Sequence, residues 1–338
     1  MAGLSQCTIE VWAPALLESA AARAALIRRS PLGRLLAYAE ADNTPARSLT
    51  DWLGRCFDLQ ASWGVAATEA AAMPELPTVN VYRADPMALV ADRQTVHTLR
   101  GAALDLPLPD ARLLAQCLNE TFAEDGLHIH VAAADRWYLS FDRPRDLRTH
   151  PPDALRRSAL REALPAGADG QWWRRLFTEM QMVLHGAPTN ARREADGLPR
   201  VNAVWLWGEG EAARPGRARP DRLAATQATA CALGDLAGIA SVDPMQWRTA
   251  DAVSRWWSGG AYGALVLAQP DAAWPGWLGL ETWLQSDRRR RVTVFTGQGR
   301  CWHCRRVGWL RRLRGRAKAR SRLIVEAAAP SDAGGPLP

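Results

Sequence analysis

Residues 184–210 read LHGAPTNARREADGLPRVNAVWLWGEG, a stretch that combines polar and apolar segments. The run Val201–Trp207 is apolar at most positions and rich in strand formers, which is typical of a buried strand. Two asparagines and an adjacent pair of arginines supply forked donors that fit carboxylate or phosphate oxygens. The closing Gly208-Glu209-Gly210 lets the backbone approach another group closely. The stretch predicts an anion or polar-ligand surface beside a buried strand. The alternative is a structural loop whose Asn and Arg side chains satisfy backbone groups.

Helical and strand-like patterns alternate around this stretch. Strands are expected at 78–82, 127–131, 136–141, 201–207, 264–268 and 292–296, and helices from Pro109 through Leu118, over 172–184 and over 223–236. The first of these strands is expected to end at Arg83-Ala84-Asp85-Pro86. The strands at 127–131 and 136–141 are expected to pair with each other. Such an alternation predicts an α/β fold built in layers.

The first 75 residues have a different texture. Over residues 10–75, Ala-rich runs place apolar side chains at helical spacing, which predicts a helical N-terminal region, 1–75. Ser48 is the expected cap of a helix that contains Trp52 and Leu53. We expect residues 76–325 to form the α/β domain and residues 326–338 to be a disordered end.

Length and composition place the chain among ordinary globular proteins. It has 338 residues, of which 48% are hydrophobic and 23% charged. We find no apolar run long enough to span a membrane and no signal-peptide pattern at the N-terminus, so we expect a cytoplasmic protein. The six cysteines are scattered, which favours free thiols over a disulfide framework.

The formal net charge of +7 is concentrated near the C-terminus. Residues 288–322 contain many arginines and no acidic residue, and the rest of the chain is net acidic. The segment 307–316 also has apolar residues at helical spacing. This pattern predicts an acidic protein, an anionic membrane surface or a nucleic acid as partner. The predicted partner-binding residues are Arg305, Arg306, Arg311, Arg312, Arg314 and Arg316. The alternative is a solvated end without a partner.

Four blocks of sequence carry a resemblance to a known family. They are Tyr82–Asp85, Ala91–Arg93, Leu184–Arg193 and Val201–Gly210. In this order they resemble the cofactor-independent phosphoglycerate mutases of the archaeal-type branch, and most closely a bacterial offshoot of RpfE-type regulatory proteins. The resemblance implies a divergent, layered α/β fold similar to that of phosphoglycerate mutases and alkaline phosphatases.

The resemblance also implies a set of ligand contacts near a phosphorylated substrate. These candidate ligand-binding residues are Arg83, Asp92, Arg93, Asn190, Arg193 and Asn202. Their chemistry suits the role, because arginine binds phosphate oxygens in a bidentate manner and asparagine amides hold hydroxyls or carboxylates. The implied ligand is a small phosphorylated or acidic molecule.

The chain departs from the family where the chemistry is concentrated. The mutases use a phosphorylated Ser nucleophile and two divalent metals held by Asp and His, with an Asp-Gly metal motif on the first strand. Here residues 1–20 contain no aspartate, and the chain has no Asp-His dipeptide. In the Asn-Arg segment, Ala187 precedes Pro188 where the family has histidine. We therefore expect no catalytic residue, no metal and no cofactor.

Two further patterns resemble metal or acid–base sites. Cys301-Trp302-His303-Cys304 has zinc-like spacing, but a complete structural site needs four ligands and no second cluster lies nearby in sequence. His128 and His130 share a face if they lie on a strand, and we expect ordinary surface or core histidines there. Sixteen tryptophans, including Trp205 and Trp207, are expected mainly in the core.

The sequence thus favours a non-catalytic regulatory or scaffolding protein derived from the mutases, with a small phosphorylated or acidic ligand. One alternative is a metal-dependent, mutase-like phosphotransferase whose Asp and His ligands converge from distant positions. The other is a nucleic-acid-binding protein that uses the basic C-terminal segment.

Overall fold

The computed structural model describes residues 6–14, 16, 30–36, 39–46, 48–91, 96–152, 155, 160–249, 251–257, 259–267, 273–297 and 299–306. The chain divides into two compact units, one from residues 1–59 and 215–338 and the other from residues 60–214. The predicted division lay at residue 75. We describe each unit by itself.

The first unit is built on a seven-stranded sheet in the order β2-β12-β11-β1-β10-β8-β9. Its strands are β1 (Cys7–Trp12), β2 (Glu40–Asn43), β8 (Arg222–Ala224), β9 (Ser241–Val242), β10 (Tyr262–Val266), β11 (Arg290–Gly297) and β12 (Arg300–Arg305). The five strands from β11 to β9 are parallel, and β12 runs antiparallel to both β11 and β2. This mixed sheet confirms the expected α/β class.

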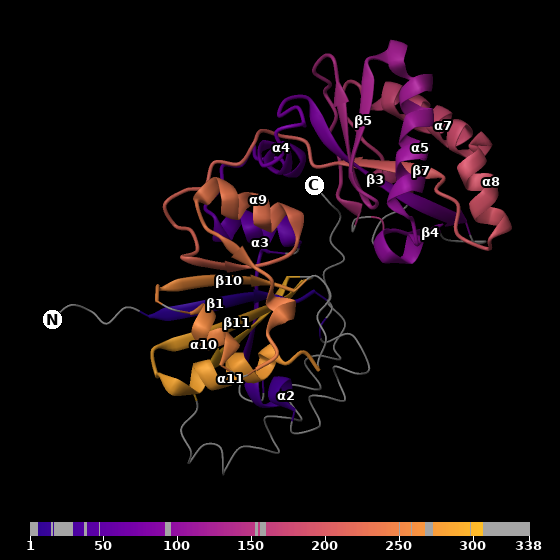
Figure 1. Ribbon diagram of the computed structural model, residues 1–338. Helices are drawn as coiled ribbons and strands as arrows, with labels where there is room; N and C mark the ends of the chain where they lie inside the picture. Colours follow the sequence, from indigo (N-terminus) through magenta and orange to yellow (C-terminus); the bar gives the residue numbers. More distant parts are fainter. Residues whose placement is uncertain are drawn as a thin grey trace. The chain divides into compact units, whose positions relative to one another are not determined.

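Helices cover both faces of this sheet (Figure 1). They are α2 (Pro31–Leu36), α3 (Leu49–Cys56), α9 (Ala228–Ala237), α10 (Ala252–Trp256) and α11 (Gly276–Ser286), with a 3₁₀ turn η4 (Pro244–Gln246). Helices α2, α10 and α11 lie on one face, and α3 and α9 on the other. On the first of these faces, alternate residues of β1 and β11 are fully buried with the helices: Ile9, Val11, Val292 and Val294.

The first strand corrects the predicted helical N-terminal region. Residues 7–12 form β1 at the middle of the sheet, and residues 40–43 form β2. The alternation in Thr8-Ile9-Glu10-Val11 is only four residues long, and the Ala-rich sequence after it dominates the helical periodicity. The expectation for Ser48 is confirmed, because its side chain accepts from Asp51 N and completes a capping box at α3.

The second unit has a five-stranded antiparallel sheet. Its strands are β3 (Val81–Ala91), β4 (Val96–Leu99), β5 (Leu127–Ala133), β6 (Arg136–Phe141) and β7 (Ala203–Trp207). The order is β4-β3-β6-β5, and β7 also pairs with β3. The long strand β3 therefore holds three neighbours along its length.

Helices pack against both faces of the second sheet. They are α4 (Val65–Ala71), α5 (Leu108–Thr121), α6 (Leu160–Ala163), α7 (Gly170–Gly186) and α8 (Pro188–Ala195), with the 3₁₀ turns η1 (Gly101–Leu104) and η2 (Ala123–Asp125). Residues of α5 and α7 form the larger core with the sheet, and α4 packs against Val81 and Tyr138. The predicted helices at 109–118 and 172–184 and the pairing of 127–131 with 136–141 are confirmed.

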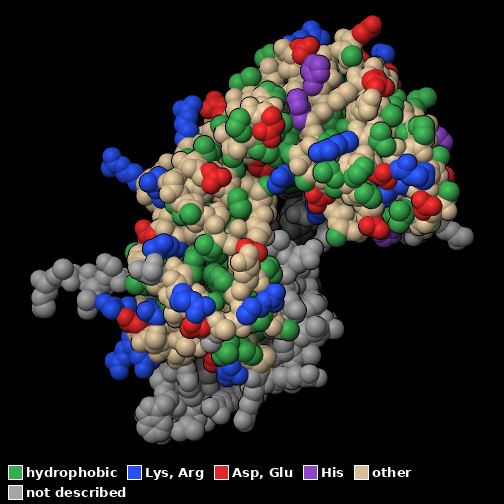
Figure 2. All heavy atoms as spheres, in the orientation of Figure 1, with side chains coloured by type: hydrophobic (Ala, Val, Ile, Leu, Met, Phe, Trp, Pro, Cys, Tyr) green, Lys and Arg blue, Asp and Glu red, His purple; other side chains and the backbone are tan. Residues whose placement is uncertain are grey.

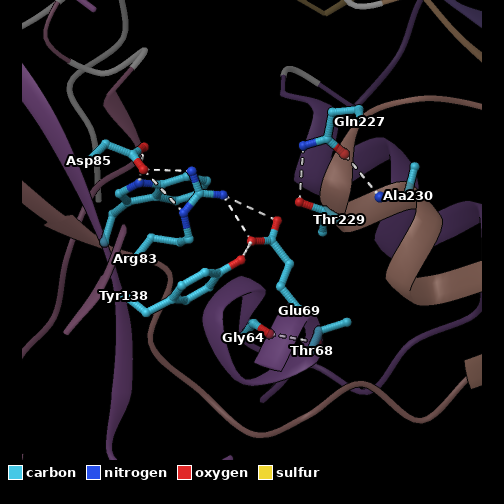
Figure 3. Close-up of polar contacts among 10 residues, drawn as sticks. Gly64, Thr68, Glu69, Arg83, Asp85, Tyr138, Gln227, Thr229 and Ala230 are labelled. Atoms are coloured by element: carbon cyan, nitrogen blue, oxygen red, sulfur yellow. Dashed lines mark hydrogen bonds and ion pairs between the residues drawn. The ribbon is translucent and has the colours of Figure 1, made fainter. Parts of the chain in front are cut away.

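Two predicted boundaries need correction. Strand β3 does not end at residues 83–86 but runs on to Ala91, with Pro86 opposite Val204 in β7. Proline's fixed φ is compatible with extended backbone, and it is tolerated where the ladder does not need its N–H. The helix expected at 223–236 is a strand, β8, followed by α9, whose N-cap is Gln227 (Figure 3).

The expectation that the tryptophans are mainly core residues is confirmed for the described part of the chain. Seven are almost fully buried: Trp52, Trp137, Trp173, Trp205, Trp277, Trp283 and Trp302. Two glycines make room for others, because a Cβ on Gly263 would lie 2.7 Å from the Trp257 ring and one on Gly276 would lie 2.2 Å from Trp274. Among the described residues, no helix has the length and apolar character needed to cross a membrane.

Candidate functional site

A buried cluster of charged and aromatic side chains joins β3, α4, β6 and β7 in the second unit (Figure 3). The Arg83 Nη1 lies 2.9 Å from Glu69 Oε2, and its Nη2 lies 2.5 Å from Asp85 Oδ1. The Tyr138 hydroxyl donates to Glu69 Oε2 at 2.6 Å, and the Trp207 indole N–H donates to Asp85 Oδ2 at 2.7 Å. The guanidinium also lies over the Tyr138 and Trp207 rings.

The electrostatics of this cluster follow from its burial. Burial opposes the charged form of Arg83, but Asp85 and Glu69 outweigh it, so the pKa of the guanidinium is raised. Burial also raises the pKa of the Asp85 carboxyl, against the attraction of Arg83. Burial and then repulsion from Glu69 raise the pKa of the Tyr138 hydroxyl above its usual range. Arg83 is thus held as a cation between two internal carboxylates.

The predicted ligand contact Arg83 already has internal partners for all of its donor groups. Its side chain is 9% exposed, and Nε, Nη1 and Nη2 all donate to Glu69 or Asp85. Ligand binding by Arg83 stays a prediction, and it requires a ligand to displace one of these two carboxylates.

Two other predicted ligand contacts lie on α8 and bind backbone. The fully buried Asn190 donates from Nδ2 to the Leu184 and Val201 carbonyls and accepts from Val201 N–H. The Arg193 side chain, 1% exposed, donates to the carbonyls of Leu104, Asp105 and Pro199. These bonds tie α8 to the chain before and after it and to the end of η1, which is the structural role given as the alternative to ligand binding.

Asn202 has a similar role at the start of β7. Its Oδ1 accepts from Leu89 N–H at 2.7 Å and its Nδ2 donates to the Leu89 carbonyl at 2.9 Å, so it acts as an extra rung between two strands. The remaining candidates, Asp92 and Arg93, lie outside the described residues. Ligand binding by these residues also stays a prediction.

The Gly208-Glu209-Gly210 turn receives another loop of the same unit. A Cβ on Gly210 would lie 2.6 Å from the Ser62 carbonyl oxygen, and Gly210 has φ +128°, so glycine is required there. The Glu209 carboxylate accepts from Thr149 N–H at 2.8 Å and also from its hydroxyl. The close approach predicted from these glycines is therefore between two backbone segments.

In the first unit, aromatic side chains fill the carboxyl end of the central strands. Open α/β sheets bind ligands outside the carboxyl ends of their parallel strands. Here β1 ends in Trp12 and β11 carries the buried Phe295 near its end. Trp52 of α3 packs between them, with ring centroids 5.9 Å from Trp12 and 6.1 Å from Phe295. We call these three residues the aromatic plug.

Beside the aromatic plug, the Glu10 carboxylate anchors α3 to the sheet. Its Oε2 accepts from Trp52 Nε1 at 3.2 Å and Arg55 Nη2 at 3.1 Å, and from the Tyr262 hydroxyl at 3.3 Å. Burial and then Glu10 raise the pKa of the nearby Cys56 thiol well above its usual value. The thiol is thus held protonated within this cluster.

The cysteine–histidine motif lies on β12 and is split by the strand. Cys301 and His303 share one face, with Cys301 Sγ 3.5 Å and Asp42 Oδ2 3.8 Å from His303 Nε2, whereas Cys304 points to the other face. Burial and Asp42 raise the pKa of Cys301 to about 11, and burial raises that of Cys304 to about 12. Within the described ranges, no group of three His, Cys, Asp or Glu side chains is placed to hold a metal ion.

The two histidines of β5 lie on one face, as predicted. His130 is 3.1 Å from the Ser140 hydroxyl, and His128 is 3.4 Å from Asp142, a carboxylate neighbour that the sequence pattern did not reveal. Burial and His128 lower the pKa of His130.

Only the start of the predicted basic partner surface is described. Arg305 forms an ion pair with Glu40, and Arg306 is exposed. The other four residues, Arg311, Arg312, Arg314 and Arg316, lie outside the described residues. On the face shown in Figure 2, basic and acidic side chains are interspersed. Partner binding by the basic segment stays a prediction.

Sequence reasoning missed the residues that surround Arg83. Glu69 is the single charged residue in the Ala-rich helix α4 and is 1% exposed. A lone acid in an apolar helix is a usable signal for a buried ionic partner. Nothing in the local sequence indicated that Tyr138 and Trp207 would bind the same cluster.

Comparisons with known proteins agree with the resemblance at its broadest level. No protein-family model matches the chain. A 105-residue stretch is 28% identical to the 2,3-bisphosphoglycerate-independent phosphoglycerate mutase of Methanosarcina barkeri, covering 30% of this chain and 26% of that protein. A 162-residue stretch is 25% identical to the probable mutase of Geobacter sulfurreducens, covering 47% and 41%. The matches thus span less than half the length of these curated relatives.

Solved structures with a similar arrangement were also found. The cofactor-independent phosphoglycerate mutase from Thermoplasma acidophilum gives a TM-score of 0.39 at 11% identity over 88% of this chain and 89% of that one. The PH0037 protein from Pyrococcus horikoshii gives 0.43 at 12% identity over 89% and 88%. On the sequence matches, the chain is a distant homologue of cofactor-independent phosphoglycerate mutases.

Proposed function

We propose that this chain is a non-catalytic homologue of the cofactor-independent phosphoglycerate mutases and acts as a regulatory or scaffolding protein of the RpfE type. The observation that carries the proposal is the aromatic plug at the carboxyl end of β1 and β11. The family resemblance implies an Asp-Gly metal motif on the first strand, and this strand instead ends in Trp12-Ala13-Pro14.

The aromatic plug supports the proposal because of what it occupies. Trp12, Trp52 and Phe295 are at most 4% exposed, and their rings pack against one another at the edge where open α/β sheets bind ligands. A two-metal phosphotransfer site needs several carboxylate and imidazole ligands in that position. Indole and phenyl rings supply none.

The internal bonds of the second unit support the proposal independently. The side-chain N–H groups of Asn190, Arg193 and Asn202 donate hydrogen bonds to backbone carbonyls. Those of Arg83 donate to two carboxylates. Phosphate recognition uses such donors free to meet the ligand. These Asn and Arg residues therefore suit a role in maintaining the fold. A homologue without activity can retain that role.

A turnover assay tests the proposal. The full chain is incubated with 3-phosphoglycerate and with Mg²⁺, Mn²⁺ or Co²⁺, and formation of 2-phosphoglycerate is measured beside the Geobacter sulfurreducens relative assayed identically. We expect no turnover above the buffer rate with any metal. Metal-dependent interconversion by this chain would overturn the proposal and favour the rearranged metal-dependent enzyme.

A further inference from the structure

The two faces of the sheet in the first unit differ in chemistry. One face is apolar and carries Ile9, Val11, Val292 and Val294. On the other face, neighbouring strands place polar residues side by side. The cross-strand partners include Thr8 with Arg291, Arg291 with Arg305, Thr293 with His303 and His303 with Glu40. At β2 and β12 this face is open to solvent, since the side chains of Glu40, His303 and Arg305 are 62%, 49% and 47% exposed.

Helix α3 accounts for only part of this polar face. Trp52 and Arg55 reach Glu10, and Arg55 also lies over the Phe295 ring, with its guanidinium carbon 4.8 Å from the ring centroid. These contacts involve residues from the middle of β1 and the carboxyl half of β11. The α3 contacts named here do not involve the amino-terminal halves of β1 and β11, where Thr8 lies opposite Arg291 and Arg291 lies beside β12.

A cavity of about 290 Å³ lies over that remaining part. It is lined by Gln6, Thr8, Glu40, Arg291, Thr293, His303, Cys304 and Arg305. Its volume is at the lower end of the range for small-molecule sites, about 300–1,000 Å³. We call it the β11–β12 pocket.

The pocket holds two arginines that face each other across β11 and β12. Arg291 and Arg305 are directly opposite in the register, and like charges in this position are unfavourable. Glu40 pairs with Arg305. The Nη1 of Arg291 donates to the carbonyls of Arg288 and Arg290, which are uncharged. Among the described residues that line the pocket there are therefore two guanidinium groups and one carboxylate, an excess of positive charge.

Hydroxyl and imidazole groups complete the donor set. The Thr293 hydroxyl is 3.1 Å from His303 Nδ1, and Thr8 lies on the adjacent strand in the lining. Guanidinium and hydroxyl donors converging on one small cavity match the oxygens of a phosphate or a carboxylate.

We propose that the β11–β12 pocket is a binding site for a small oxyanion, a phosphate monoester or a carboxylic acid, held by Arg291 and Arg305. Within the first unit the site lies away from the carboxyl end of the central strands, and none of the six ligand contacts predicted from the sequence is among its lining residues. The residues that form the site all belong to the first unit and none of them is part of the aromatic plug. The proposal for this site is therefore independent of whether the chain is catalytic.

Titration calorimetry of the full chain tests the site with three probes: inorganic phosphate, 3-phosphoglycerate and malonate. We expect at least one probe to bind. Binding of inorganic phosphate indicates phosphate as the ligand chemistry and binding of malonate indicates carboxylate, whereas 3-phosphoglycerate carries both groups. Arg291→Gln should weaken binding about tenfold or more, because a bidentate charged donor is lost. Arg288→Gln, an equal change of charge on an exposed neighbour, should leave affinity within about twofold.

Glu40→Gln supplies a second test that does not remove an arginine. Removing the single carboxylate of the lining should tighten oxyanion binding, since its repulsion is lost and Arg305 is released. The thermal midpoint of each variant without ligand shows that it is folded. The proposal is overturned if none of the three probes binds, if Arg291→Gln binds like the wild type, or if Arg288→Gln weakens binding equally.

Discussion

The Arg83 cluster and the β11–β12 pocket use the same residue types in opposite ways. Arg83 is buried with two carboxylates, a tyrosine and a tryptophan, and every donor nitrogen has an internal partner. Arg291 and Arg305 line an open cavity, where Glu40 pairs with Arg305 and Arg291 donates to backbone carbonyls. The comparison shows that an arginine indicates a ligand site only when the carboxylates around it do not fully neutralise its charge.

The largest expected effect on stability comes from removing Arg83 from its buried cluster. Arg83→Ala leaves Glu69 and Asp85 buried without their cation, which should lower the free energy of unfolding by about 3–5 kcal/mol. Chemical denaturation at pH 7 measures the change. Arg175→Ala is the matched control. Its partner Glu179 is on the same helix and its side chain is 82% exposed, so little or no loss of stability is expected. Equal losses for the two variants would contradict a self-contained cluster.

Asn190 tests whether the Asn-Arg segment maintains the fold. Asn190→Ala removes three hydrogen bonds and leaves the N–H and the carbonyl of the buried Val201 without this partner, whereas the Leu184 carbonyl still accepts from Ala187 N–H. We expect a loss of about 2–3 kcal/mol in unfolding free energy. The half-buried Asn202→Ala, which removes two bonds, should cost less when measured in the same denaturant series. A stability unchanged in Asn190→Ala would show that the segment is free for another role.

Tyr138→Phe sharpens the comparison by deleting one hydrogen bond of the closed cluster. At pH 7 it should cost about 1–2 kcal/mol, because Glu69 loses a buried donor. Since the folded pKa of Tyr138 lies above its unfolded value of 10.0, the unfolded chain releases this proton first. The wild-type advantage is full below pH 10 and decreases as the pH rises above 10. Denaturation of both proteins at pH 8, 9.5 and 11 should therefore show a narrowing gap, and a constant gap would contradict the shift.

The smallest expected effect comes from the open pocket. Without ligand, Arg291→Gln relieves a like-charge pair across β11 and β12, so unfolding free energy should stay within about 0.5 kcal/mol of the wild type. Arg305→Gln loses only a solvent-exposed ion pair, worth about 0–1 kcal/mol. Thermal unfolding in low-salt buffer without phosphate measures both. A loss as large as that of Arg83→Ala would mean that the pocket arginines are structural.

Much of the fold could be predicted where a pattern is long or strongly periodic. Helix α7 buries Trp173, Leu176, Met180 and Leu184 at helical spacing, and the alternation from Leu127 marked β5. The six-residue strand β1 was missed, because its pattern is short and its place in the sheet depends on contacts with residues more than 250 positions away.

The candidate site was harder to predict for a chemical reason. Asn190 and Arg193 carry donors that bind a backbone carbonyl as well as a phosphate oxygen, so residue type alone does not choose between them. The choice depends on whether the backbone beside them lacks partners, as Val201 and Pro199 do here. The β11–β12 pocket depends on the cross-strand register of Arg291 and Arg305, which sequence spacing did not reveal.

Amide hydrogen exchange with and without 3-phosphoglycerate tests most directly whether the open pocket, and not the closed segment, meets a ligand. We expect added protection in peptides covering residues 290–305 and no change in peptides covering residues 184–210. Added protection over 184–210 with none over 290–305 would contradict this expectation, and would return the ligand to the Asn-Arg segment.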